Sequence, residues 1–247
     1  MQRYFISPTQ INGDQIQIVG DDVHHIKTVM RSQIGDQFIC CDGQGIDYLV
    51  EIIEIHSQYI YCQVIRSSPS QGEPMTQVAI AQSLPKGDKL EMILQKGTEI
   101  GAVSFYPFTS ERTIVKLQEK KGQKKWERWQ RIVKEAAEQS HRGQLPQVYA
   151  PMNWKQLLEE IAKAELALIA YEKGGVPLSH VVSHEAKRIL LVIGPEGGFS
   201  EHEIEEAKAV GAIPITLGSR ILRTETASLV ALSCILFSRK DLGGETE

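Results

Sequence analysis

Gly194-Pro195-Glu196-Gly197-Gly198 is the stretch that decides the fold, because it follows an apolar run over residues 189–193 and leads through Phe199 into a helix start. The three glycines let the backbone approach a ligand closely. A continuous apolar run is typical of a parallel strand covered on both faces. Open α/β sheets bind ligands at the carboxyl ends of such strands. We therefore predict an α/β domain with a ligand site at this loop, the alternative being a tight turn without a ligand.

A second loop follows the next apolar strand, which is predicted over residues 213–217. It reads Leu217-Gly218-Ser219-Arg220-Ile221-Leu222-Arg223-Thr224-Glu225-Thr226-Ala227. Two apolar residues separate Arg220 from Arg223, and a purely solvated loop would not need them. We favour ligand contact for both loops, although Glu225 also suits a helix N-terminus without any ligand. Neither loop is a GxGxxG motif or a P-loop, so phosphate binding is unsupported.

The composition is that of an ordinary globular protein, with 247 residues, 42% hydrophobic and 23% charged, and a formal net charge of −4. The most apolar stretch, residues 227–237, is too short to span a bilayer. The first residues lack the apolar run of a secretory signal. We therefore expect a cytoplasmic protein with no membrane partner. The cysteines form no CxxC pair, which predicts buried reduced thiols and no metal site.

The hydrophobic rhythm changes at residues 67–74, a small polar stretch that we interpret as a linker. Before it, period-two patterns predict strands that close into a small antiparallel barrel with one short helix starting at residue 21 or 22. After it, strands alternate with helices, for which Asp88, Asn153 and Ser200 are the expected N-caps. We predict two domains, residues 1–72 and residues 73–247, the second of α/β type. The barrel strands are expected over residues 15–19, 37–41, 46–55 and 59–66.

Positive charge is concentrated around one predicted helix. Residues 116–142 contain nine Lys or Arg and four Glu, an excess of five positive charges in a chain of net charge −4. Such a tract is the electrostatic footprint of a polyanion, with a merely solvated helix face as the alternative. The polar helix end, Glu135-Ala136-Ala137-Glu138-Gln139-Ser140-His141-Arg142, is a third candidate site.

Several motifs, found in order along the chain, resemble those of one known protein family. The motifs are Lys86-Gly87-Asp88-Lys89; Gln95-Lys96 with Thr98-Glu99-Ile100-Gly101; Glu135-Ala136 with Gln139-Ser140 and Arg142; Ile193-Gly194-Pro195-Glu196-Gly197-Gly198-Phe199-Ser200 with Glu203; and Leu217-Gly218 with Arg220-Ile221-Leu222-Arg223-Thr224-Glu225-Thr226-Ala227. Together with His25 and Met30-Arg31, they resemble the RsmE family of bacterial small-subunit rRNA methyltransferases. GPEGG paired with ILRxETA is specific where either alone is weak.

The resemblance implies a fold that the residue pattern alone does not predict. The pattern favours an ordinary doubly wound sheet, because knots are rare. The resemblance implies a SPOUT-type α/β domain whose C-terminal segment forms a trefoil knot, preceded by a PUA-like β-barrel RNA-binding domain. It also implies S-adenosyl-L-methionine as cofactor, methylation of N3 of a specific uridine in 16S rRNA of the small ribosomal subunit, and a homodimer.

In this resemblance the two glycine-bearing loops form the walls of the cofactor pocket. Uridine N3 carries a proton, so methylation needs a base or a cation that stabilises the uridine anion. Arg142 and Arg223 suit the cationic role. Glu196 is the available carboxylate, with hydrogen bonding to its own loop as the alternative. The cofactor contacts are expected from Ile193, Gly194, Pro195, Glu196, Gly197, Gly198, Leu217, Gly218, Ile221, Leu222, Arg223, Thr226 and Ala227.

RNA affinity is expected from basic residues in both domains, since phosphate contacts are blind to sequence. These are His25, Arg31, Lys86, Lys96, Lys120, Lys121, Lys124, Lys125, Arg128 and Arg142. The last helix is apolar around much of its circumference, which either a second subunit or complete burial in the monomer core would satisfy. The resemblance favours a two-fold dimer in which Arg142 of one subunit reaches the cofactor loops of the other.

Two alternatives to this function stay open. One is a SPOUT-type methyltransferase that acts on a different RNA base, and the other is a non-catalytic RNA-binding module. A hydrolase is disfavoured because the GxSxG motif is absent.

Overall fold

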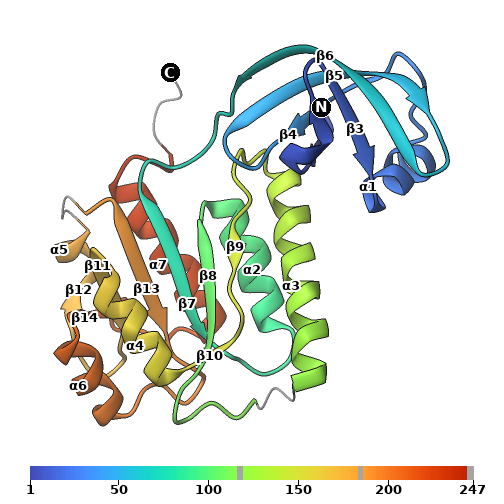
Figure 1. The fold of residues 1–247 in the computed structure, drawn as a ribbon. Coiled ribbons are helices and arrows are strands. Elements are labelled where there is room, and N and C mark those ends of the chain that lie inside the picture. Colours follow the sequence, from blue (N-terminus) through green and yellow to red (C-terminus); the bar gives the residue numbers. More distant parts are fainter. Residues whose placement is uncertain (116–118, 183–185, 244–247) are drawn as a thin grey trace. The chain divides into compact units, whose positions relative to one another are not determined.

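The computed structural model describes residues 1–115, 119–182 and 186–243, and it describes the helix of residues 119–121 without their side chains (Figure 1). The chain forms two compact units. The N-terminal unit contains residues 1–73 and 137–145, and the C-terminal unit contains residues 74–136 and 146–247. The chain first passes from the N-terminal unit to the C-terminal unit between residues 73 and 74, next to the predicted domain boundary between residues 72 and 73. The return of residues 137–145 to the N-terminal unit was not predicted, because those residues continue a helix.

The N-terminal unit is built on one six-stranded sheet in the order β1-β4-β5-β6-β3-β2. All neighbouring strands are antiparallel except β1 and β4. No ladder closes β2 onto β1 in the described residues, so the predicted closed barrel is an open sheet in its pairing. The strands are β1 Arg3–Phe5, β2 Ile11–Asn12, β3 Gln15–Val19, β4 Gln37–Cys41, β5 Ile46–Ile55 and β6 Tyr59–Pro69.

A short helical segment interrupts this sheet between β3 and β4. It begins as α1, Asp21–His24, and continues as a π-helical turn, His25–Val29. Its apolar residues Val23 and Ile26 are buried in the core of the unit. The predicted N-cap, Asp21 or Asp22, is wrong, because Gly20 holds the N-cap position and no side chain caps the helix.

The C-terminal unit contains a parallel sheet in the order β10-β8-β7-β13-β11-β14-β12, with β9 paired to β8. Every pairing in it is parallel. The α/β prediction for this part of the chain is confirmed. The strands are β7 Gln77–Ser83, β8 Ser104–Thr109, β9 Gln147–Val148, β10 Met152–Asn153, β11 Leu166–Ala170, β12 Val176–Pro177, β13 Arg188–Ile193 and β14 Ala212–Thr216.

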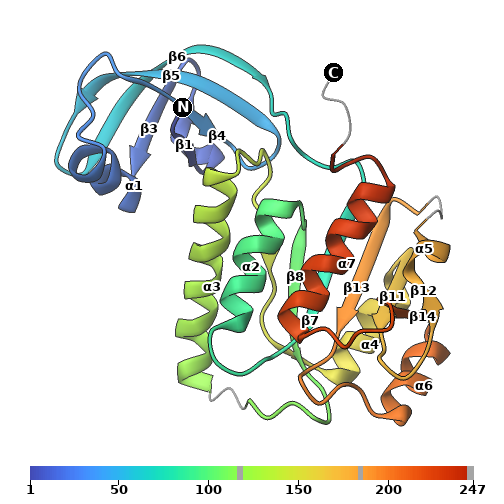
Figure 2. The same ribbon diagram turned by 180° about the vertical axis from the view of Figure 1, so that it is seen from behind.

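Helices cover both faces of this sheet, as Figures 1 and 2 show from opposite sides. One face carries α2 and α7, and the other carries α4 and α6. The capping boxes predicted at Asn153 and Ser200 are confirmed, whereas Asp88 makes no side-chain cap. The helices are α2 Lys89–Ile100, α3 Glu119–Gln139, α4 Trp154–Lys163, α5 Leu178–Val181, α6 Glu201–Ala209 and α7 Thr224–Ser238.

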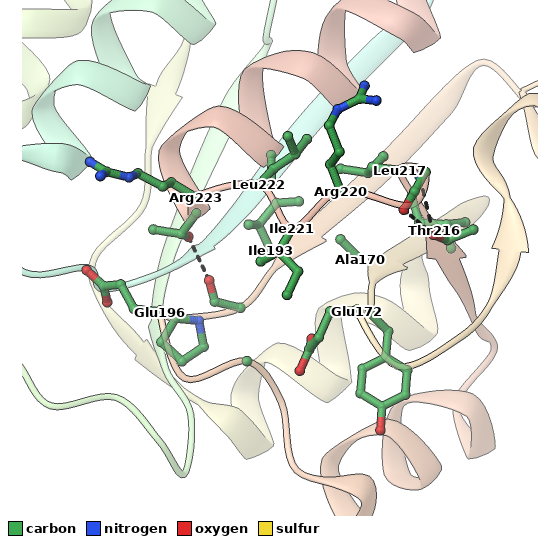
Figure 3. A pocket seen from close by; sticks show the side chains of 18 of the residues that line it. Ala170, Glu172, Ile193, Glu196, Thr216, Leu217, Arg220, Ile221, Leu222 and Arg223 are labelled. Atoms are coloured by element: carbon green, nitrogen blue, oxygen red, sulfur yellow. Dashed lines mark hydrogen bonds between the residues drawn. The ribbon is translucent and has the colours of Figure 1, made fainter.

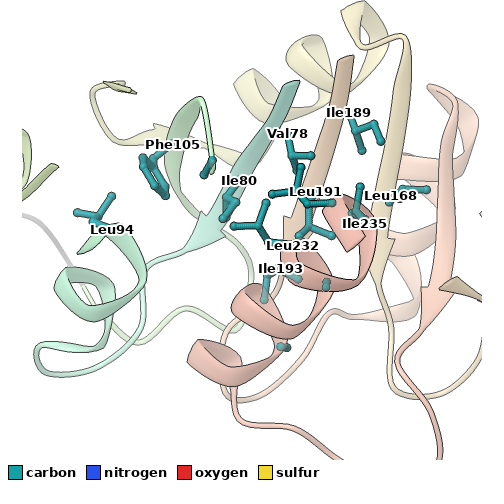
Figure 4. Packing of buried hydrophobic residues seen from close by; sticks show 14 of the residues in the cluster. Val78, Ile80, Leu94, Phe105, Leu168, Ile189, Leu191, Ile193, Leu232 and Ile235 are labelled. Carbon is teal, nitrogen blue, oxygen red and sulfur yellow. The ribbon is translucent and has the colours of Figure 1, made fainter. Parts of the chain in front are cut away.

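The last helix returns to the middle of the sheet. After β14, α7 packs against β7 and β13 rather than beside β14, and its Leu232 and Ile235 lie among Ile80, Leu191 and Ile193 (Figure 4). These side chains are buried, and such burial contributes about 1.5–3 kcal/mol per large aliphatic residue. The return brings the start of α7 beside the end of β13, next to the loop that decides the fold.

Three of the cysteines, Cys40, Cys41 and Cys62, are buried free thiols as predicted, and burial raises the pKa of Cys62 to about 12. Cys234 is exposed on α7, which corrects the prediction for that residue. Across the described ranges no three His, Cys, Asp or Glu side chains are grouped as metal ligands, and no helix is long and apolar enough to cross a membrane.

Candidate functional site

A cavity of about 560 Å³ lies at the carboxyl ends of β11, β13 and β14 in the C-terminal unit. Its walls are the segments 170–172, 193–198 and 215–224, completed by Lys89 and Ala227 (Figure 3). These strands are neighbours in the sheet, so the loops that follow them meet at one edge. The volume is within the range of small-molecule sites. The two loops selected from the sequence therefore face the same space.

Most of the residues predicted to contact a cofactor line this cavity. They are Ile193, Gly194, Pro195, Glu196, Gly197, Gly198, Leu217, Gly218, Ile221, Leu222, Arg223 and Ala227. Thr226 is the exception, since it is exposed on α7 and is not part of the wall. The cofactor role of these side chains stays a prediction at this point.

The glycines of the two loops have different reasons to be glycine. A Cβ on Gly194 would lie 3.0 Å from the buried ring of Phe199, so this position serves packing. Gly198 has a φ of 66°, and its Cβ would lie 2.5 Å from the Glu172 carboxylate. Gly218 has a φ of 106°, and a Cβ there would meet no protein atom within 4 Å. Only Gly218 combines a left-handed backbone with open space at the cavity.

Glu196 is engaged by its surroundings. Its Oε1 accepts hydrogen bonds from Lys89 Nζ at 2.9 Å and from the backbone N–H of Lys86 at 3.2 Å. Partial burial, the largest single influence, would raise the pKa of Glu196, but the hydrogen bonds from Lys89 and the backbone together with the charge of Lys89 outweigh it, so the pKa is lowered. A carboxylate held in its charged form by two donors is a poor general base. The alternative role, hydrogen bonding within the loop region, is the one that this geometry favours.

Lys89 connects two carboxylates at the cavity wall. Its Nζ also lies 3.5 Å from Glu225 Oε2, and Glu225 is only 9% exposed. The hydrogen bond with Glu196 raises the pKa of Lys89. Lys89 is therefore a fixed cation at the site. Sequence reasoning quoted it only as part of a motif and did not place it here.

Arg223 lies at the cavity, as predicted from the sequence. It occupies the N-cap position of α7, is exposed, and lines the cavity together with Arg220. The two arginine side chains extend in different directions (Figure 3). Arg223 can therefore offer a permanent positive charge to a ligand.

Glu172 is a second residue that sequence reasoning missed. It follows β11 by two residues and lines the cavity (Figure 3). The signal was present, because residues 166–170 read as a buried parallel strand and ligands lie beyond the carboxyl ends of such strands. The loop after this strand contains Gly174-Gly175, but it was not selected from the sequence.

Arg142 does not line the cavity of its own chain, so its catalytic role stays a prediction. It belongs to the N-terminal unit, its side chain is 3% exposed, and its Nε and Nη2 donate to the Glu73 carboxylate at 2.8 and 2.7 Å. A buried guanidinium in a two-pronged ion pair is not available to a substrate. Within one chain Arg142 serves this ion pair, and its predicted reach to a partner's cofactor loops stays a prediction.

The remaining predicted RNA contacts are spread over both units. In the N-terminal unit, Arg31 is exposed with a φ of 55°, and His25 Nδ1 lies 3.0 Å from the Tyr4 hydroxyl. In the C-terminal unit, Lys86 is exposed and Lys96 forms an ion pair with Glu99 at 2.8 Å.

The basic tract lies mainly on α3. Lys124, Lys125 and Arg128 are exposed on it, and Arg128 forms an ion pair with Glu91 at 2.7 Å. The side chains of Lys120 and Lys121, and Lys116 as a whole, lie outside the described residues. The buried face of α3 carries Trp129 and Val133 into the core of the C-terminal unit, so the basic residues occupy its outer face.

Comparisons with known proteins agree with this architecture. An RNA methyltransferase domain family matches residues 72–236, and an RNA methyltransferase PUA domain family matches residues 18–65. The chain is therefore an RNA methyltransferase with a SPOUT-type α/β domain and a PUA-like N-terminal domain, as the resemblance implied.

The particular family follows from the relatives. The ribosomal RNA small subunit methyltransferase E of Bacillus subtilis is 43% identical over 99% of this chain and 100% of its own length. That of Synechocystis is 38% identical over 94% of this chain and 76% of its own. The chain belongs to the ribosomal RNA small subunit methyltransferase E family. The crystal structure of the Neisseria gonorrhoeae enzyme, bound to S-adenosyl methionine, superposes with a TM-score of 0.88 at 28% identity, over 96% of this chain and 98% of that one.

Proposed function

We propose that this protein transfers a methyl group from S-adenosyl-L-methionine to N3 of a specific uridine in 16S rRNA of the small ribosomal subunit. The observation that carries the proposal is the cavity formed where the loops after β13 and β14 meet. The relatives named as small-subunit rRNA methyltransferases, and the one solved with the cofactor, support it.

The cavity fits the proposed cofactor in shape and in chemistry. Apolar side chains of Ile193, Leu217 and Leu222 offer a surface for a flat base, and Gly218 leaves open space beside it. The carboxylates of Glu172 and Glu196 suit a ligand that carries positive charge. When bound, the cofactor supplies an electrophilic methyl group.

The residues of the chain then have to position the target base and handle its proton. Arg223, at the start of α7, is suited to stabilise the uridine anion, because its guanidinium stays charged and can donate to the carbonyl oxygens beside N3. Lys89 is a second fixed cation near the same wall. Glu196 holds Lys89 in place rather than accepting the N3 proton. In this assignment the N3 proton passes to water, and electrostatic stabilisation of the remaining uridine anion takes the place of a general base.

The outer face of α3 is proposed as the main phosphate contact, joined by Arg31 and Lys86. Such contacts supply affinity without sequence preference. The target uridine is expected to be unstacked, since N3 lies on the pairing edge of the base. A cytoplasmic location follows from an rRNA substrate.

Calorimetric titration with S-adenosyl-L-methionine, followed by transfer of a labelled methyl group to small ribosomal subunits and to naked rRNA, tests the proposal. We expect saturable binding of one cofactor per chain and label in RNA. Binding of RNA without any binding of cofactor would instead identify a non-catalytic RNA-binding module.

A further inference from the structure

A buried polar network ties the two cavity loops together. Gln82 Nε2 donates to Thr224 Oγ1 at 2.8 Å, and Thr224 Oγ1 donates to the carbonyl oxygen of Gly194 at 2.7 Å. Ser228 Oγ donates to Gln82 Oε1. Gln82, Thr224 and Ser228 are 1%, 6% and 0% exposed. Each hydroxyl and amide group in this network therefore has its partner inside the protein.

The network joins three segments that are far apart in sequence. Gln82 is on β7 and pairs in register with Ile193 at the end of β13. Gly194 opens the loop after β13, and Thr224 is the residue at which the loop after β14 becomes α7. Thr224 and Gly194 line the cavity, whereas Gln82 does not. Gln82 thus reaches the cavity wall only through Thr224.

The position of Gln82 argues for a specific role. Its strand reads Gln77-Val-Ala-Ile-Ala-Gln82-Ser83, and Val78, Ile80 and Ala81 are buried apolar residues. A buried amide without partners is costly, and an apolar residue of similar size would fill the same space. A fully satisfied polar network instead selects one arrangement of its partners.

We propose that Gln82 and Thr224 are positioning residues that hold the loop after β13 and the loop after β14 in one fixed arrangement before a ligand binds. The proposal rests on the proposed function only for the identity of that ligand. Loops that are already in place do not have to be ordered on binding, so affinity is gained without any contact from Gln82.

The test uses Thr224→Val and Gln82→Met, which remove the hydrogen bonds with little change in volume. Thr98→Val is the matched control, because Thr98 is 0% exposed, lies on α2 of the same unit and is not part of the cavity wall. Thr224→Ser keeps the hydroxyl and serves as the rescue variant. Circular dichroism and thermal unfolding check that each variant folds.

Two readouts are expected to move in the positioning variants. The dissociation constant for S-adenosyl-L-methionine should rise about tenfold in Thr224→Val and in Gln82→Met, while Thr224→Ser stays within about twofold of the natural protein. The double variant should bind S-adenosyl-L-methionine no more weakly than Thr224→Val does, because the loss of one hydrogen bond is enough to interrupt the network. Thr98→Val should lower the thermal midpoint and leave the dissociation constant unchanged.

The second readout needs no cofactor. The amide hydrogens of Gly198 and Ala227, which donate to Pro195 O at 2.9 Å and Arg223 O at 2.8 Å, should exchange about tenfold faster in both positioning variants of the free protein. Unchanged exchange, or effects on affinity that multiply in the double variant, would overturn the proposal. Faster exchange in a protein that binds no cofactor would uphold the positioning role and refute the proposed function.

Discussion

The ion pair between Glu73 and Arg142 shows how a single residue is assigned by its surroundings. Besides the two bonds from Arg142, Glu73 Oε1 accepts from the backbone N–H groups of Gly143 and Gln144 at 2.9 and 3.1 Å. Burial, the largest single influence, would raise the pKa of Glu73, but the hydrogen bonds and charge of Arg142 together with the two backbone N–H groups outweigh it, and the pKa is lowered. This carboxylate anchors residues 142–144 to the N-terminal unit.

Replacing Glu73 by Gln should destabilise the protein by about 3 kcal/mol at pH 7, because Arg142 would keep a buried charge without this carboxylate. The pKa of Glu73 is lower in the folded state, so its contribution is present above the ordinary glutamate value and is lost as the pH falls through the lowered folded value. The variant should therefore lose stability less steeply than the natural protein in that acidic window. Urea unfolding as a function of pH measures both effects.

Glu201→Gln is the matched control for this prediction. Glu201 pairs with Lys173 at 3.3 Å, but its side chain is 81% exposed, and such surface pairs contribute little. The control should unfold like the natural protein. An equal acid slope in Glu73→Gln and the natural protein would contradict the role given to Glu73.

Changing the single residue Gly218 tests directly whether the cavity binds the cofactor. We expect Gly218→Val to weaken S-adenosyl-L-methionine binding at least about tenfold, since the new side chain enters open space at the wall. Gly211→Val is a close control: Gly211 has a φ of 101° and nothing within 4 Å of its Cβ, but it precedes β14 and is outside the cavity. Both variants carry similar backbone strain. Equal loss of affinity in calorimetry would mean that strain, not the cavity, is responsible.

At the scale of elements, local pattern predicted the long strands and helices well. Strands β3, β4 and β5 have the bounds expected from periodicity and turn residues. The two-residue strands β2, β9, β10 and β12 were missed, because so short a segment has no period and forms only by pairing with another strand. The ion pair of Arg142 could not be predicted for a related reason, since its partner Glu73 lies 69 residues away in sequence.

The candidate site could be predicted to the extent that it is made of loops following apolar strands. The loops after β13 and β14 met this description, and their residues line one cavity. Lys89 could not be placed there because it comes from α2, a helix whose position against the sheet is set by packing. The Gln82 network was likewise invisible, since it depends on the return of α7.

Helix α3 gives the prediction that belongs to this scale. Reversing Lys124, Lys125 and Arg131 to Glu should weaken RNA binding and reduce the salt slope by about one for each phosphate that is no longer neutralised. The matched control reverses three exposed lysines elsewhere, Lys155, Lys187 and Lys240. RNA affinity measured over a range of salt concentrations separates the two. An unaltered salt slope in the α3 variant would mean that these basic residues form a solvated helix face and do not contact RNA.

At the scale of the whole molecule, α7 has one exposed apolar face. Most of its apolar residues are buried in the C-terminal unit, but Val230 and Phe237 are 37% and 67% exposed, and Cys234 between them is exposed as well. Their spacing places them on one side of the helix. We propose that this face, the α7 face, packs against the same face of a second chain in a two-fold dimer.

The combined variant Val230→Glu with Phe237→Glu should turn the dimer into a monomer without unfolding it, because both side chains are outside the core. Sedimentation velocity measures the mass, and Ile114→Glu, at a residue 68% exposed elsewhere on the C-terminal unit, is the control. A natural protein that sediments as a monomer, or an α7 variant that stays dimeric, would contradict this assignment.

The most direct test of the whole account is the identity of the methylated nucleoside. Small ribosomal subunits that lack the modification would be incubated with the protein and S-adenosyl-L-methionine, and the digested 16S rRNA analysed by mass spectrometry. We predict one 3-methyluridine per 16S rRNA, formed by the natural protein and strongly reduced by Gly218→Val but not by Gly211→Val. A methyl group on another base or another atom, or no methyl transfer to rRNA, would contradict the account.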